Sequence, residues 1–227
     1  MNAPRSAEEI AALDLATPFE LMKFTLTYDG FLPSCGNRNP RLKEKWDIRR
    51  KLHPQLAELW QADPVLAKVA RHSKLPKAGG LASFEQHHSF PEYQPADQNF
   101  SYIDICRKEM TFIPLVRDSL ALICGVNILF LRKEDPGALI KQGGDLDNRI
   151  KTLFDALRLP EEGDEMQCCK EDDPQPFYCL LESDSLISNF SVDSDRLLTS
   201  SNSNANEARL VVTVPLKLHK FAATTFC

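Results

Sequence analysis

The stretch GGDLDNRIKTLFDALRLP, residues 143–160, constrains this chain more than any other part of its sequence. Apolar residues recur there at helical spacing and predict an amphipathic helix that ends near Leu159: Ile150, Leu153, Phe154 and Leu157. Asp147 stands just before this apolar pattern, where an aspartate side chain can cap the first turn. The opposite side of the helix is polar, so we expect it to face solvent or a ligand.

Asp145 and Asp147 are one residue apart directly before this helix. If the backbone is extended there, both carboxylates point to the same side, and they repel each other unless a cation lies between them. Mg²⁺ prefers such oxygen ligands and is typically held by one or two carboxylates with water and phosphate. Lys151, one helical turn farther, can contact a phosphate oxygen. The alternative interpretation is a capped helix with an acidic first turn and no metal.

A magnesium site built on two aspartates needs a third acid, and the segment LLESDSLI, residues 180–187, supplies candidates. Glu182 and Asp184 interrupt a strand of apolar residues, where acids are rare unless they meet water, a partner or a metal. The alternative is an edge-strand bulge whose acids are simply solvated.

The two segments together resemble the RusA-like Holliday-junction resolvases, also called crossover-junction endodeoxyribonucleases. That family's first pattern is D-L-D-N-x-x-K-x-x-x-D-A-L, and its second segment is a short acidic pair before a small strand. The matching positions are Asp145, Leu146, Asp147, Asn148, Lys151, Asp155, Ala156 and Leu157, then Asp184 in the second segment. The turn after the first strand also resembles the family at Pro33, Ser34 and Asn37.

The resemblance implies a homodimer with an α+β fold that cleaves phosphodiesters at four-way DNA junctions with Mg²⁺, or with Mn²⁺ in its place. It implies that Asp145, Asp147 and Asp184 are metal ligands and that Lys151 is a catalytic or phosphate-contacting cation. The metal would activate a water and orient the scissile phosphate.

The chain departs from the family pattern at several places. Ser183 stands where the family often has a second acid, and Gly144 stands where it often has a basic residue before the first aspartate. The loop at about 160–176 is longer and strongly acidic, so it would repel DNA unless it folds away from the site. An irregular insertion at about 73–98 is also extra. These departures weaken the expectation of a strict preference for junctions over other branched DNA.

Charge is distributed unevenly, although the net charge of −5 alone counts against a nucleic-acid binder. Residues 38–51 hold seven Arg and Lys, whereas residues 161–173 hold seven acids. We predict that the basic segment, together with Asn148, binds DNA phosphates through these residues: Arg38, Arg41, Lys43, Lys45, Arg49, Arg50 and Lys51. The alternative is a solvated helix face. Trp46 fits a core position better than a base-stacking position.

The order of the expected elements favours an α+β fold with a mixed β-sheet and packed helices. Alternating or continuous apolar runs predict strands at 19–33, 100–116, 120–133, 177–193 and 209–218, with a break near 182–185 in the fourth. A helix is expected over 41–62, broken or kinked at Pro54. We predict an N-terminal arm at 1–17 and one nuclease domain at 18–227 that contains the insertion and the acidic loop.

Seven cysteines, none in a C-x-x-C pair, and an N-terminus without an apolar core indicate reduced thiols in a cytoplasmic protein. No apolar run reaches the roughly 18 residues that span a bilayer, so we expect no membrane. A zinc site at Cys168 and Cys169 is a minor alternative, since vicinal cysteines lack the usual ligand spacing. His87 and His88, in the insertion, are expected to be incidental.

Three functions remain open from the sequence. The first is a metal-dependent DNA endonuclease of RusA type. The second is a catalytically weak or inactive module of the same fold that binds branched DNA or a protein. The third is a structural or regulatory protein whose acidic loop mimics nucleic acid or docks a basic partner.

Overall fold

The computed structural model describes residues 20–34, 41–73, 103–133, 145–198 and 207–218. In chain order the elements are β1 (Glu20–Phe31), α2 (Leu42–Ala62), α3 (Pro64–Ser73), β2 (Ile105–Arg107), β3 (Met110–Val116), the short 3-10 helix η1 (Asp118–Leu120), β4 (Leu122–Arg132), α6 (Asp145–Leu157), η2 (Glu165–Cys168), β5 (Phe177–Leu181), η3 (Asp184–Leu186), β6 (Ile187–Arg196) and β7 (Glu207–Leu218). The arm at 1–17 and the insertion, apart from Ser73, lie outside these residues.

The strands form two sheets rather than the single mixed sheet that the sequence suggested. One sheet has the order β1-β7-β4-β6 and the other the order β2-β3-β5. Each contains one parallel pair, β4 with β6 and β3 with β5, and the remaining pairs are antiparallel. The α+β class and the mixed strand directions are therefore confirmed, whereas the number of sheets was wrong.

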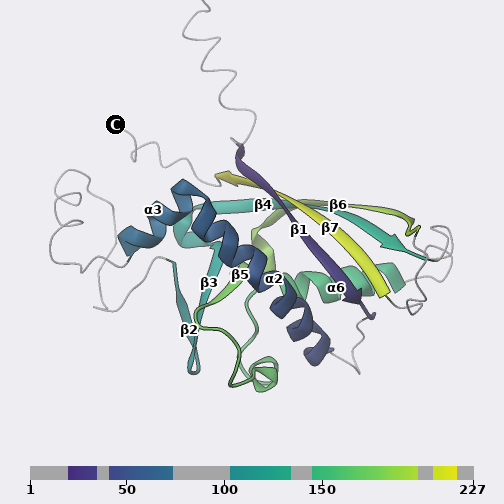
Figure 1. The fold of residues 1–227 in the computed structure, drawn as a ribbon, viewed down its shortest axis with the longest axis horizontal. Helices are drawn as coiled ribbons and strands as arrows, with labels where there is room; N and C mark the ends of the chain where they lie inside the picture. Colours follow the sequence, from purple (N-terminus) through teal and green to yellow (C-terminus); the bar gives the residue numbers. More distant parts are fainter. Residues whose placement is uncertain (1–19, 35–40, 74–102, 134–144, 199–206, 219–227) are drawn as a thin grey trace, which may run out of the picture.

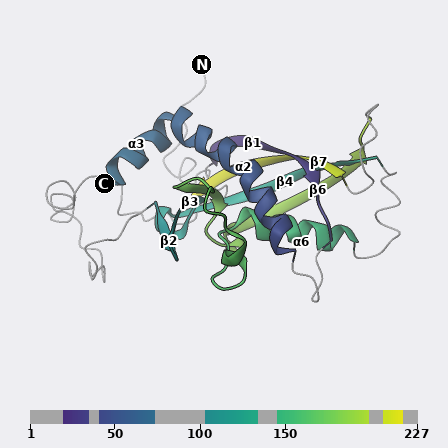
Figure 2. The ribbon, with the colours of Figure 1, turned by 60° about the horizontal axis from the view of Figure 1, so that its bottom comes forward.

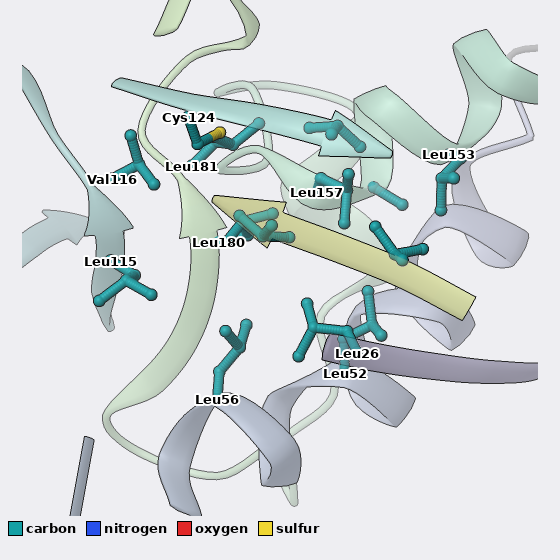
Figure 3. Packing of buried hydrophobic residues seen from close by; sticks show 14 of the residues in the cluster. Leu26, Leu52, Leu56, Leu115, Val116, Cys124, Leu153, Leu157, Leu180 and Leu181 are labelled. Carbon is teal, nitrogen blue, oxygen red and sulfur yellow. The ribbon is translucent and has the colours of Figure 1, made fainter. Parts of the chain in front are cut away.

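Helices α2 and α6 pack on one face of the larger sheet, and α2 also crosses β5 of the smaller one (Figures 1 and 2). Alternate residues of β1 and β7 are buried on that face, as Leu26, Tyr28 and Leu210 illustrate. One apolar cluster therefore takes side chains from both sheets and both helices, including Leu52, Leu153 and Leu180 (Figure 3). This core fixes α6 between β5 and the larger sheet.

Helix α2 runs through Pro54 without interruption, so of the two predicted effects of this proline the break is wrong and the kink stays a prediction. A proline inside a helix removes one backbone hydrogen bond and costs about 3 kcal/mol. The apolar anchors continue on both sides of Pro54, with Leu52, Leu56 and Trp60 all at most 3% exposed. Burial of these side chains offsets the missing hydrogen bond and keeps the segment helical on both sides of Pro54.

The strand predictions hold with refined bounds. The segment predicted as one strand at 100–116 is a hairpin of β2 and β3, and the segment at 177–193 is divided into β5 and β6 by η3, close to the predicted break. No described helix is long and apolar enough to cross a membrane.

Candidate functional site

The motif aspartates lie in helical backbone, not in the extended backbone that would make their carboxylates converge. Helix α6 begins at Asp145, so Asp147 belongs to its first turn and does not cap it. Residues two positions apart on a helix do not share a face. Acidic residues in a first turn are nevertheless stabilised by the partial positive charge of the helix amino end. The backbone argument for a pair of converging aspartates is therefore wrong.

A polar stripe follows one side of α6 and consists of Asp147, Asn148, Lys151 and Asp155. The first three side chains are exposed and Asp155 is half-buried. Their positions, i, i+1, i+4 and i+8, fall on one side of a helix with 3.6 residues per turn. Ile150 and Leu153 lie on the opposite side and are buried in the core. The amphipathic pattern predicted from the sequence is thus confirmed.

The buried motif positions fasten α6 to the end of β1. The guanidinium of Arg149 donates a hydrogen bond to the carbonyl of Leu32, and the hydroxyl of Thr152 shares its one hydrogen between the carbonyl of Pro33 at 3.1 Å and that of Asn148 at 3.0 Å. Arg149 is 6% exposed and Thr152 is fully buried. The residues after β1 are therefore held against the same part of α6 that carries Asn148 and Lys151.

Two kinds of charged residue occupy the polar stripe. Asp147 and Lys151 have no ion-pair or hydrogen-bond partner for their side chains among the described residues. Asp155, in contrast, lies 2.7 Å from the Nζ of Lys45 and 3.5 Å from Arg158. Asp147 and Lys151 are therefore available to a ligand, whereas Asp155 is committed to the interior of the fold.

Asp184 lines an open pocket of about 260 Å³ at the carboxyl end of α6. The other lining residues are Arg107, Asp155, Arg158, Leu159, Glu161, Glu182 and Ser183. The Asp184 side chain is exposed and its only described contact is the Ser183 hydroxyl at 3.5 Å. Ser183 caps η3, because its hydroxyl accepts a hydrogen bond from the amide of Ser185 at 3.3 Å. The serine at this position thus orders the turn that carries Asp184.

The predicted ligands Asp147 and Asp184 lie toward opposite ends of α6. The pocket of Asp184 reaches Asp155, which is eight residues, a helix rise of about 12 Å, beyond Asp147. Among the side chains that the structure describes, no three His, Cys, Asp or Glu residues gather at metal-binding distance. The side chain of Asp145 is outside that set. Unpaired carboxylates fit a hard cation at either end of α6, but the described residues do not bring Asp147 and Asp184 into one cluster.

The basic segment is divided between the interior and the surface. The side chains of Lys45 and Arg49 are only 6% and 1% exposed and form ion pairs with Glu165. Arg50 forms an ion pair with Asp173, and Arg41 forms one with Glu44. Lys43 and Lys51 are exposed on α2, and Arg38 lies outside the described residues. The basic residues of α2 therefore match neither alternative from the sequence, because some are buried in ion pairs and others are exposed. Trp46 is fully buried, as predicted.

Sequence reasoning missed that the acidic loop turns two of its carboxylates, those of Glu165 and Asp173, inward. A buried charge cluster joins Lys45, Arg49, Asp155, Arg158 and Glu165. The hydrogen bond from Trp46 Nε1 to the carbonyl of Glu165, 2.5 Å long, closes it. No local pattern distinguishes Glu165 from its exposed neighbours. The one sequence signal for this pairing is that residues 38–51 hold seven basic residues and residues 161–173 hold seven acids.

Asp173 and His53 anchor the far end of the loop to α2. Burial alone would raise the pKa of Asp173, but hydrogen bonds from Arg50 and from the amide of Lys170 hold that pKa below its usual range. The Nδ1 of His53 accepts a hydrogen bond from the amide of Tyr178 at 2.9 Å, and burial lowers the pKa of this imidazole. Both groups fix the start of β5.

The described cysteines are free thiols, and the zinc site considered at Cys168 and Cys169 has no third ligand among the described side chains. Burial raises the pKa of Cys124 and of Cys179 to about 12, so neither is a reactive thiolate. His87 and His88 lie outside the described residues.

No protein-family model matches the chain, and no curated protein or solved structure is significantly similar to it.

Proposed function

We propose that this protein is a metal-dependent endodeoxyribonuclease of RusA-like type that nicks four-way junctions or other branched DNA and acts as a cytoplasmic homodimer. The observation that carries the proposal is the division of charges on α6. Asp147 and Lys151 are exposed and without a described partner on a helix whose buried side is locked to β1 and to the core. A rigid element that presents an uncompensated carboxylate and an ammonium suits phosphodiester hydrolysis.

The roles follow from position. Asp147 would hold Mg²⁺ or Mn²⁺, which would supply an activated water and charge for the leaving oxygen; Asp145 belongs to the same first turn, but residues two positions apart on a helix do not share a face. Lys151, one turn along α6, would contact a phosphate oxygen. Asp184, which the resemblance implies as a third ligand, lies at the other end of the polar stripe and would not share a metal with Asp147 in this arrangement. Asn148, Lys43 and Lys51 are the remaining exposed candidates for DNA contacts, whereas Lys45 and Arg49 are committed to Glu165 and are not candidates.

A second candidate is a module that binds branched DNA but does not cut it. The observation that favours it is the separation of Asp147 and Asp184 along α6, because a metal held by fewer carboxylates is bound more weakly. The two candidates make opposite predictions for cleavage and the same prediction for binding.

The experiment uses a labelled four-way junction and a matched linear duplex, each with Mg²⁺, with Mn²⁺ and with EDTA. Wild type is compared with Asp147→Asn and Lys151→Met. Asp193→Asn and Lys23→Met serve as matched controls, since both residues are exposed and lie on strands β6 and β1. We expect metal-dependent nicks in the junction that are reduced in the α6 variants by at least about 100-fold and kept in the controls.

The outcomes separate the candidates. Cleavage by Asp147→Asn at the rate of wild type contradicts the metal site. Tight junction binding without nicks in any metal supports the binding module. If the wild type neither binds nor cuts branched DNA, the nuclease assignment is wrong.

A further inference from the structure

A second pocket, of about 330 Å³, lies between the end of β1 and the first half of α2. We call it the β1–α2 pocket, and its lining residues are Tyr28, Phe31, Glu44, Asp47, Arg50 and Lys51. Its volume falls at the lower end of the range of small-ligand pockets, and its lining combines two aromatic rings with four charged side chains. The pocket therefore has the size and chemistry to take one planar polar molecule.

Phe31 presents an aromatic face that the fold does not use. Its side chain is 43% exposed, although the next residue, Leu32, is completely buried. The hydroxyl of Tyr28 donates a hydrogen bond to the carbonyl of Phe31 at 2.8 Å. The backbone is thus fixed while the ring remains in contact with solvent, which is the geometry of a stacking platform.

Lys51 is held in place over the ring of Tyr28 in the same pocket. Its Nζ lies 5.0 Å from the centroid of the Tyr28 ring and donates a hydrogen bond to the carbonyl of Asp29 at 2.5 Å. A Cβ at Gly30 would lie 2.6 Å from this Nζ, so the glycine is what leaves room for it. An ammonium has three donors, and its exposed side retains N–H groups for an anion.

Two carboxylates of α2, the helix that also carries Lys51, line the β1–α2 pocket, and each lies 3.3 Å from an arginine, Asp47 from Arg50 and Glu44 from Arg41. Asp47 has a side chain that is 63% exposed, and Glu44 is 26% exposed. Carboxylates repel a phosphate but accept hydrogen bonds from the exocyclic amino groups of bases. The occupant is therefore expected to place an amino group toward Asp47 and Glu44 and its negative charge toward Lys51.

We propose that the β1–α2 pocket takes one unpaired nucleobase with an exocyclic amino group, stacked on Phe31 and with a neighbouring phosphate on Lys51. The class comprises adenine, cytosine and guanine, and thymine is disfavoured because it lacks such a group. This inference rests on the proposed action on branched DNA and adds how an opened branch point is recognised. Phe31 is two residues before Pro33, whose carbonyl bonds Thr152 next to Lys151, so one short segment joins the pocket to the polar stripe.

The test measures binding in EDTA, where cleavage plays no part. The probes are forked duplexes that differ only in one unpaired nucleotide at the branch, dC or dT, followed by fluorescence anisotropy. The variants are Phe31→Leu, Phe31→Trp, Gly30→Ala and Asp47→Asn. Phe190→Leu is the matched control, because Phe190 is also an exposed phenylalanine, at 59%. Circular dichroism and urea unfolding establish that each variant is folded.

We expect wild type to prefer dC and Phe31→Leu to bind the dC probe about 5- to 150-fold more weakly, the range for loss of one stacked base. Phe31→Trp and Phe190→Leu should bind as wild type does, and Asp47→Asn should reduce the preference for dC, because the amide replaces a charged acceptor by a neutral one and adds a donor. Gly30→Ala should weaken binding by displacing Lys51 and the Tyr28 hydroxyl, which lie 2.6 Å and 2.9 Å from the added Cβ.

The results that overturn the inference are specific. If Phe31→Leu binds the dC probe as tightly as wild type does, or if wild type binds dC and dT probes equally, the nucleobase pocket is contradicted. If wild type still cleaves junctions in that case, the proposed function is unaffected. A wild type that neither binds the forks nor nicks junctions contradicts both.

Discussion

At the scale of single residues, Glu165 decides where the acidic loop lies. Its carboxylate is 7% exposed and lies 3.4 Å from Lys45, 3.0 Å from Arg49 and 3.5 Å from Arg158. It also accepts a hydrogen bond from the amide of Glu161 at 2.8 Å. One side chain thus neutralises cations from α2 and from the end of α6. Part of the negative charge of the loop is therefore neutralised inside the protein and does not face solvent.

We expect Glu165→Gln to destabilise the protein by about 3–5 kcal/mol, because removal of one partner leaves buried charges uncompensated. Urea unfolding followed by circular dichroism measures the free energy of unfolding. Glu162→Gln is the control, since Glu162 is exposed in the same loop, and it should change that free energy by no more than about 0.5 kcal/mol. Equal stabilities for both variants would show that Glu165 does not hold the loop.

His53 predicts a pH dependence of stability. Burial lowers the pKa of His53 in the folded state below its usual 6.5. The unfolded chain therefore takes up a proton first, so this contribution to stability is complete above pH 6.5 and is lost as the pH falls toward the folded pKa. His53→Asn keeps an acceptor for the amide of Tyr178 but does not titrate. Urea unfolding from about pH 7.5 to about pH 5 should show a smaller loss for this variant than for wild type. Parallel curves would contradict the assignment.

At the scale of elements, α6 is positioned by its contact with the end of β1. Thr152 and Arg149 bond the carbonyls that follow the strand. Both carbonyls belong to the segment that leads from Phe31 toward the turn, so α6 and the β1–α2 pocket are mechanically linked. The position of the polar stripe is thus set by residues that face away from it.

Thr152→Val should cost about 1–2 kcal/mol of stability, because the shape is kept while a buried carbonyl is deprived of its donor. Hydrogen–deuterium exchange should become faster in α6 and in the last residues of β1, and the free energy of unfolding should fall in urea. Thr25→Val, on the exposed side of β1, provides the comparison. Unchanged exchange in α6 would mean that this hydrogen bond does not position the helix.

At the scale of the whole molecule, ion pairing decides which cations remain for a partner. The net charge of −5 and the count of basic residues at 38–51 describe the chain, but Lys45 and Arg49 are neutralised in the interior. Lys43, Lys51 and Lys151 are exposed in the described part of the chain. The basic charge that residues 38–51 leave for a partner is therefore smaller than the sequence suggests.

The salt dependence of junction binding tests this distribution. Lys43→Ala should reduce the slope of log K against log salt by about 0.9 for each phosphate that the lysine neutralises in wild type, while the fold remains stable. Lys23→Ala, on an exposed position of β1, should leave the slope unchanged. Lys45→Ala should act on stability instead, because it removes a buried partner of Asp155. An unchanged slope for Lys43→Ala would exclude this residue from the interface.

The sequence by itself determined the parts that depend on neighbours along the chain. The apolar periods of β1, β4, β7, α2 and α6 are strong enough to predict these elements within a few residues, and the acids at 182–184 predicted the break between β5 and β6. Side-chain period and turn chemistry are local properties, so one sequence suffices for them. The same patterns identified Trp46 as a core residue.

Only the tertiary structure decided how distant residues meet. The strand pairing divides into two sheets because parallel pairs join segments far apart in the chain, and no local pattern specifies them. Glu165 and Asp173 meet α2 across more than 100 residues, so their inward orientation was not predictable. The helical start of α6 and the separation of Asp147 from Asp184 likewise depend on how α6 packs between β5 and the larger sheet. Burial and pairing are properties of the folded chain, and they decide which of these charges remains available for chemistry.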